Sequence, residues 1–153
     1  MRRTRTLLAI LLAMTLALPV HTALAASGGP TPLEISVTED SCGPWTTCGT
    51  AVGKLGHATV VTEVTGFAPL PSGCFSDTHT STLTFEDGSA LALDVSGELC
   101  PTFTGFRFTG LYSVDGGAST ARFSGATGSG LVRASRDAGP IHATFRGQLT
   151  LTQ

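Results

Sequence analysis

Apolar and polar side chains alternate along most of this chain, and turn-forming residues interrupt the alternation at short intervals. Leu83 and Phe85, for example, share one parity, while Thr82, Thr84 and Glu86 share the other. A period of two places the two sets on opposite faces of a β-strand. After residue 25, apolar residues nowhere recur at helical spacing over a useful length, so the pattern predicts an all-β fold with almost no helix.

About eight such runs follow one another, and Asp87-Gly88 between two of them is a strong hairpin signal. Short strands at regular spacing are typical of a barrel or a sandwich. Closure removes exposed strand edges, and glycines inside the strands suit the bends of a small barrel. We therefore expect an eight-stranded antiparallel up-and-down β-barrel, with a two-sheet β-sandwich as the alternative. The expected strands are 33–38, 57–67, 79–86, 91–99, 106–114, 118–123, 131–135 and 141–151, and 39–56 is expected to be a loop.

Residues 1–25 have the three parts of a secretory signal peptide. Three arginines among the first five residues are followed by an apolar stretch over 7–18 and by an A-x-A site that ends at Ala25. The apolar stretch is too short to span a membrane comfortably. We expect cleavage after Ala25, a secreted protein, and no membrane span in the mature chain.

The chain beyond the signal peptide divides into a small-residue lead over 26–32, expected to be flexible, and a single domain over 33–153. The whole chain has a formal net charge of −2, and removal of the N-terminal arginines makes it more acidic. Nucleic acid and anionic membrane surfaces are poor partners for such a chain.

Four cysteines, Cys42, Cys48, Cys74 and Cys100, all lie in the exported part. An even number in an oxidising compartment indicates two disulfides, for which three pairings exist. We favour Cys42–Cys48, which closes a short loop, and Cys74–Cys100, which joins a loop after one strand to the end of another. No C-x-x-C pair or adjacent histidine supports a zinc site, so we expect no metal.

The segment 116–130 combines a glycine pair, a short run that ends at Phe123, and three further glycines. We interpret it as a turn, a strand, a bulge and a turn, where the sheet bends to close. The order G-x-x-G-x-G, with no helix after it, does not match a dinucleotide-binding loop. The glycines expected to have structural roles are Gly116, Gly117, Gly125, Gly128 and Gly130.

Gly116-Gly117 and the string from Arg122 to Gly128 resemble the glycine-rich signature of dirigent proteins and the wider allene-oxide-cyclase-like barrel superfamily, and 145–151 resembles their closing strand. The family's second glycine pair is replaced here by Ser119-Thr120-Ala121. The resemblance implies an eight-stranded antiparallel barrel. It carries over no catalytic residues, because the matched positions are glycines, an alanine and a phenylalanine.

A small barrel is either filled by side chains or holds one small ligand. Six aromatic residues are expected inside, and Tyr112 is the one among them with a polar group. We predict Tyr112 as a ligand contact, with Arg107 or Trp45 at a mouth, and a small hydrophobic ligand or an envelope component as the partner. The interior set is Phe85, Phe106, Phe108, Tyr112, Phe123 and Phe145.

No pattern in the sequence indicates catalytic residues or a cofactor. His57, His79 and His142 fall outside the apolar stripes and are interpreted as solvated, as are Glu39-Asp40 and Glu86-Asp87.

Three functions stay open: a secreted, non-catalytic binding or envelope-associated barrel, which we favour; an isomerase or cyclase acting on a hydrophobic small molecule; and a structural or adhesive surface module. An open apolar cavity with at least two buried polar groups would favour the second of these. A filled interior with an exposed aromatic patch would favour the third.

Overall fold

The structure is a computed structural model that describes residues 29–152. The expected signal peptide, 1–25, and the first residues of the expected lead lie outside the described part. Thr31 and Pro32, expected to belong to the lead, instead begin the first strand, where they pair with Leu149 and Gln148.

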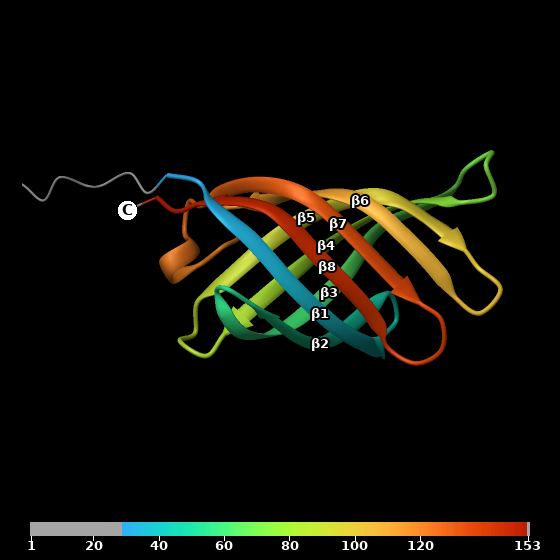
Figure 1. Ribbon diagram of the computed structural model, residues 1–153, viewed down its shortest axis with the longest axis horizontal. Helices are drawn as coiled ribbons and strands as arrows, with labels where there is room; N and C mark the ends of the chain where they lie inside the picture. The colour runs from blue at the N-terminus through green and yellow to red at the C-terminus, as the bar shows by residue number, and fades with distance from the viewer. Residues whose placement is uncertain (1–28, 153) are drawn as a thin grey trace, which may run out of the picture.

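Eight antiparallel strands form one closed barrel, in which each strand pairs with the next along the chain and the last pairs with the first (Figure 1). The up-and-down barrel prediction is confirmed, and the sheet has no second layer of the kind a sandwich requires. The strands are β1 (Thr31–Gly43), β2 (Thr46–Gly53), β3 (Gly56–Pro69), β4 (Phe75–Phe85), β5 (Ala90–Pro101), β6 (Phe106–Asp115), β7 (Thr127–Arg136) and β8 (Ile141–Thr150).

The expected loop 39–56 is wrong, because β1 continues to Gly43 and β2 fills most of the rest. Glu39 keeps the inward parity of Ile35 and Val37, so the strand does not end where the apolar pattern ends. Its backbone is paired on both sides, with Gly49 of β2 and with Ile141 of β8. The chain reverses at Trp45, which has a positive φ of 59°.

The expected strand 118–123 is also wrong, because this segment ends in a short 3₁₀ helix, η1 (Ala121–Phe123). The hydroxyl of Ser119 accepts from the Ala92 N–H and donates to the Asp115 carbonyl, which ties the segment to β5 and β6 without strand pairing. Ala121 has a φ of 50°, which a strand does not permit. The predicted number of strands, eight, is therefore correct, although the expected strand 118–123 is absent and β2, which was not expected, is present.

The five glycines expected to be structural lie in or beside this connection. Gly125 has a φ of 70°, a conformation that glycine adopts without strain. A Cβ on Gly116 would lie 2.7 Å from the Gly125 carbonyl carbon, so this turn also needs a glycine. Gly117 follows in the same turn, where its N–H donates to the Asp115 carboxylate, whereas Gly128 and Gly130 belong to β7.

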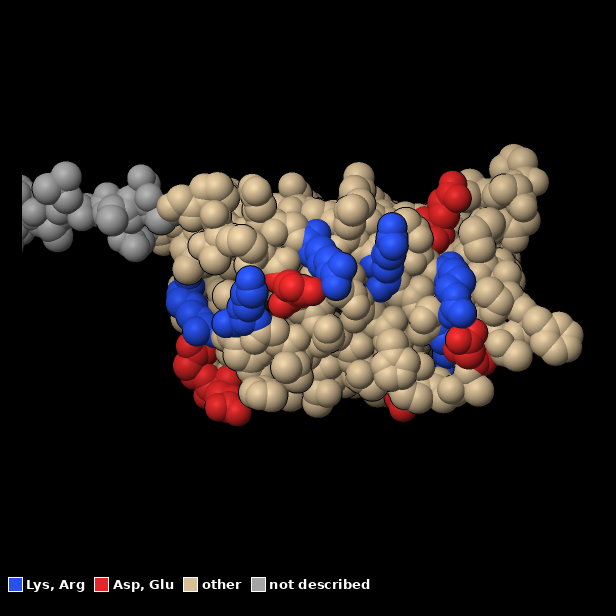
Figure 2. All heavy atoms as spheres, viewed as in Figure 1, with Lys and Arg blue, Asp and Glu red and all other residues tan. Residues whose placement is uncertain are grey.

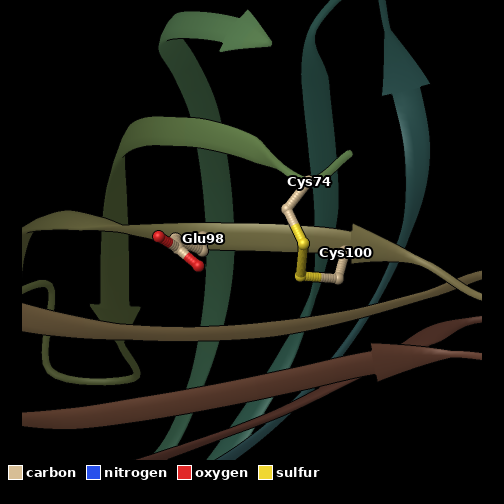
Figure 3. A group of neighbouring side chains, drawn as sticks. All are labelled: Cys74, Glu98 and Cys100. Carbon is tan, nitrogen blue, oxygen red and sulfur yellow. A yellow bond between two sulfur atoms is a disulfide. The ribbon is translucent and has the colours of Figure 1, made fainter. Parts of the chain in front are cut away.

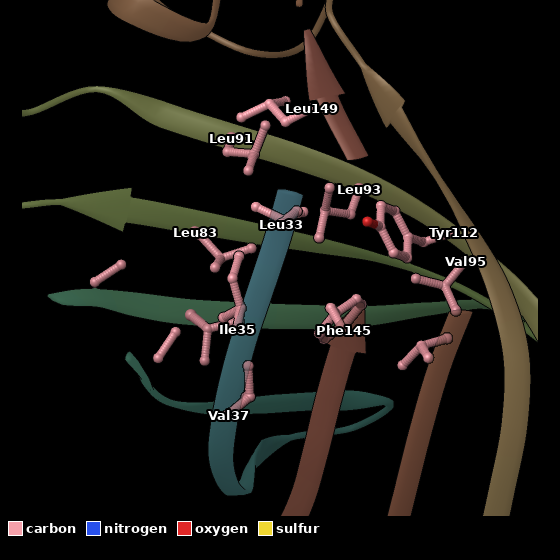
Figure 4. Close-up of a cluster of buried hydrophobic side chains, with 14 of the residues drawn as sticks. Leu33, Ile35, Val37, Leu83, Leu91, Leu93, Val95, Tyr112, Phe145 and Leu149 are labelled. Carbon is pink, nitrogen blue, oxygen red and sulfur yellow. The ribbon is translucent and has the colours of Figure 1, made fainter. Parts of the chain in front are cut away.

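The two ends of the barrel differ. Phe123 of η1 is 1% exposed and packs its ring against Phe85, which closes the end of the barrel where β1 begins and β8 ends (Figure 1). We call Phe123 and the rest of η1 the plug. Next to the plug, aliphatic side chains from β1, β4, β5 and β8 fill the interior of the barrel (Figure 4). This packed half is built from Leu33, Ile35, Leu83, Leu91, Leu93 and Leu149. Within residues 29–152, no helix has the length and apolar character needed to cross a membrane.

Candidate functional site

The other end of the barrel holds a cavity of about 220 Å³, which we call the mouth cavity. It lies at the end formed by the connections 44–45, 70–74, 102–105 and 137–140, away from η1. Most of its wall is apolar, so water gains little by occupying it. The apolar wall includes Val64, Leu99, Phe106, Phe108, Val132 and Phe145, and the polar side chains at its surface are Glu39, Thr47, Thr62, Asp77, His79 and Ser81.

A hydrogen-bonded chain of three side chains crosses one wall of the mouth cavity. The Thr62 hydroxyl donates to Glu39 Oε1 at 2.7 Å, and the hydroxyls of Thr62 and Ser81 lie 2.8 Å apart. With Glu39 ionised, Thr62 gives its only proton to the carboxylate, so Ser81 is the donor to Thr62. Glu39 is only 6% exposed, so its carboxyl group is held inside the barrel with a hydroxyl, that of Thr62, as its hydrogen-bond partner.

A second polar pair lies on β4. Asp77 and His79 are two residues apart on one strand and therefore share its inner face. The imidazole Nδ1 and Asp77 Oδ1 are 3.1 Å apart, and the ring centre lies 5.4 Å from that of Phe108. A carboxylate at this position orients the imidazole. The pair therefore places an imidazole, a group that can act as a base, at the wall of the mouth cavity.

Of the three predicted ligand contacts, Trp45 is the one that lies at the mouth cavity. Its side chain is 67% exposed at the rim and its ring centre is 6.0 Å from that of Phe67, which in turn stacks on Phe75 at 4.6 Å. Arg107 points outward near the same end, where it pairs with Asp137 at 3.1 Å, and it is not part of the wall.

Tyr112, the third predicted contact, is buried in the barrel and is not part of the cavity wall. Its ring meets Phe145 edge-on with 5.7 Å between centres, and its hydroxyl has no hydrogen-bond partner within residues 29–152. Burial raises the pKa of Tyr112 to about 12. Tyr112 and Trp45, which were predicted to contact the same ligand, therefore do not line the same cavity.

The polar residues of the cavity were missed by the sequence analysis, although a parity signal for them exists. Asp77, His79 and Ser81 continue, two residues at a time, the inward parity of Leu83 and Phe85. Asp77 and Ser81 were given no role from the sequence, and the interpretation of His79 as solvated is wrong: its side chain is 12% exposed and faces the cavity. His57 and His142, by contrast, are exposed.

Both disulfides form with the favoured pairing, Cys42–Cys48 and Cys74–Cys100. Glu98 lies beside the second one, and its carboxylate and the two sulfurs gather within 4.8 Å (Figure 3). The sulfurs are bonded to each other, so they offer no thiolate to a metal. The group is therefore a disulfide with a neighbouring carboxylate, near the open end of the barrel.

Comparison with protein-family models, with curated proteins and with solved structures finds no match for this chain. The fold and the site by themselves define a small disulfide-linked β-barrel with a closed end, an open end and a mainly apolar cavity between its strands.

Proposed function

We propose that this protein is a secreted, non-catalytic binding barrel that holds one small apolar molecule in the mouth cavity. The observation that carries the proposal is the contrast between the two ends, since side chains fill the barrel at η1 and leave about 220 Å³ open at the mouth. An apolar cavity of about 150 Å³ binds benzene, so this one suits a ring with a short chain. Two disulfides fit an extracellular setting.

Propylbenzene tests the proposal, and Trp45 is the reporter because it is the only tryptophan of the chain and lies at the rim. Titration should change Trp45 fluorescence saturably and raise the melting temperature, since a ligand that binds only the folded state stabilises it. Ala143→Phe fills the cavity from β8 and should abolish both effects. Thr144→Phe, on the outer face of the same strand, is the matched control. Absence of any response in the unmodified protein would overturn the proposal.

A second function, an isomerase or cyclase acting on a hydrophobic small molecule, is favoured by the combination of an open apolar cavity with at least two buried polar groups, the feature expected of it. The Asp77–His79 pair is the one among these groups that includes a base. A base within an apolar cavity removes a proton from carbon more readily when its partner carboxylate stabilises the imidazolium. Phenylacetone in D₂O should then exchange its α-protons faster with the protein than with free imidazole at equal concentration. His79→Gln should remove the excess rate and leave propylbenzene binding intact. Exchange no faster than with free imidazole would exclude this second function.

A further inference from the structure

The mouth cavity contains two buried carboxylates and no basic side chain of lysine or arginine. Glu39 and Asp77 are each 6% exposed, and both belong to the cavity wall. On the face shown in Figure 2, the lysine and arginine side chains lie on the outer wall of the barrel. Among residues 29–152 the basic side chains are Lys54, Arg107, Arg122, Arg133, Arg136 and Arg146, and none of them is part of the cavity wall.

With Glu39 and Asp77 ionised, the cavity carries a net negative charge in either protonation state of His79. A protonated His79 offsets Asp77, its partner at 3.1 Å, and a neutral one leaves Asp77 uncompensated. In the part of the chain that the structure describes, the side chain of Glu39 has only the hydroxyl of Thr62 as its hydrogen-bond partner. With both carboxylates ionised, at least one negative charge inside the barrel has no positive partner, and buried charges in proteins are ordinarily paired.

Aromatic rings line the same cavity as these carboxylates. Phe106, Phe108 and Phe145 form part of the wall, and Trp45 and Phe67 lie at the rim. The faces of such rings attract cations, and aromatic sites of this kind bind alkylated ammonium groups. The same wall therefore offers negative charge for a cationic group and apolar surface for the rest of the molecule.

We infer that the ligand of the mouth cavity is an organic cation: a protonated amine or a quaternary ammonium group on an apolar body of roughly nine non-hydrogen atoms, scaled from the benzene-sized cavity. The cationic group lies toward Glu39, and the apolar body lies against the phenylalanines. This inference rests on the proposed binding function and specifies its ligand class.

The test compares 2-phenylethylamine with propylbenzene, which has the same shape with a methyl group in place of the ammonium group. The amine is protonated at neutral pH, as a lysine is. By Trp45 fluorescence and by calorimetry at pH 7, the amine should bind about tenfold more tightly than propylbenzene, a difference of the size that a paired buried charge provides. Phenylacetate, the anionic counterpart, should bind more weakly than both.

Glu39→Gln removes the charge and keeps the shape, so it should weaken amine binding about tenfold and change propylbenzene binding less than about twofold. Glu34→Gln is the matched control, because Glu34 lies on the outer face of the same strand and pairs with Arg146 at 3.0 Å. It should change neither affinity. Asp77→Asn provides the same comparison if the Glu39 variant does not fold.

The outcomes separate the inference from the function on which it rests. Equal binding of the amine and propylbenzene, or amine binding that neither Glu39→Gln nor Asp77→Asn weakens, overturns the cation inference and leaves the apolar cavity as a binding site. Binding of the amine alone would overturn the purely apolar ligand and keep the cation inference, whereas failure of all three probes to bind overturns both proposals.

Discussion

Tyr112 and Glu39 both have a polar group inside the barrel, but they differ in whether that group has a hydrogen-bond partner. The Glu39 carboxylate accepts a hydrogen bond from Thr62 and faces the cavity, whereas the Tyr112 hydroxyl is buried with no partner among the described residues. Leaving such a hydroxyl without a partner costs about 1–3 kcal/mol. The cost is offset by the ring, which fills interior volume that no smaller side chain would fill.

The pKa of Tyr112 provides a direct test of its burial. As the only tyrosine, it is the sole source of phenolate absorbance, and the titration midpoint should lie near 12 instead of near 10. Because the folded protein holds this proton more tightly than the unfolded chain, stability should be full below pH 10 and should fall as the pH rises toward 12.

Tyr112→Phe should remove this part of the pH dependence and, at pH 7, raise the free energy of unfolding by about 1 kcal/mol. Denaturant unfolding at pH 8 and at pH 10.5 measures both effects. A phenolate midpoint near 10 would show that the hydroxyl reaches water and that Tyr112 is not buried as described.

At the scale of elements, inward-facing glycines make room for aromatic rings across paired strands. Gly97 of β5 and Gly110 of β6 are register partners, and a Cβ on either would lie within 2.8 Å of the Phe108 ring. Gly130 of β7 and Gly147 of β8 are partners in the same way beneath Tyr112. Each ring covers two positions without side chains, which lets the sheet curve tightly and keeps the interior filled.

The two disulfides should differ in their effect on stability. Cys74–Cys100 closes a separation of 26 residues and Cys42–Cys48 one of 6. In the chain-entropy model the longer link contributes about 3.5 kcal/mol and the shorter one about 2 kcal/mol. Replacing each pair by serines should therefore lower the free energy of unfolding more for the longer link, as measured by urea denaturation. A larger loss of stability on removal of Cys42–Cys48 than on removal of Cys74–Cys100 would contradict this prediction.

Phe123 closes one end of the barrel. Its ring is enclosed with Phe85, and the Arg122 guanidinium lies 4.7 Å from both ring centres. Phe123→Ala should cost about 3–5 kcal/mol because a fully buried ring leaves a cavity behind. Phe103→Ala, at an exposed ring in the β5–β6 connection, is the control and should change stability by less than about 0.5 kcal/mol. Equal effects of the two substitutions would rule out the plug.

At the scale of the whole molecule, the pairing of β8 with β1 decides the architecture. It spans the chain from Thr31 to Leu149 and removes the last two free edges of the sheet. Closure also places one end of the barrel over η1 and leaves the other to the mouth cavity, so the binding site is a consequence of the topology.

Truncation tests the closure. A chain that ends at Pro140 lacks β8 and leaves β1 and β7 with unpaired edges, so it should aggregate or stay unfolded. A chain that ends at Thr150 keeps all eight strands and loses the 2.8 Å hydrogen bond from Thr152 to Ser124, so its stability should fall by about 1 kcal/mol. Size-exclusion chromatography and circular dichroism distinguish these results. A monomeric, folded product that ends at Pro140 would contradict the role of closure.

The sequence by itself determined the features that depend on near neighbours. Alternation with a period of two assigns residues such as Leu83 and Phe85 to one face whatever the strand pairs with, and glycine turns mark where strands end. The all-β class and the approximate number of strands were predicted in this way, whereas the barrel was also supported by the resemblance to a barrel superfamily, and the disulfide pairing was chosen among three from the loops that it closes. The same rule failed at Glu39 and at His79, because a polar residue at an inward position looks like the end of a strand or like an exposed face.

Only the tertiary structure decided where those polar residues meet and which end stays open. Glu39, Thr62 and Ser81 come from three strands, and the pairing register of the closed sheet sets the distances among them. The η1 plug likewise depends on hydrogen bonds to β5, which is far away in the sequence: the Ala92 N–H donates to the Ser119 hydroxyl, and the Thr120 N–H donates to the Ala90 carbonyl. Local patterning specifies the face of the sheet on which a side chain lies. Closure and register specify which side chains from other strands lie next to it, and these contacts between strands form the binding site.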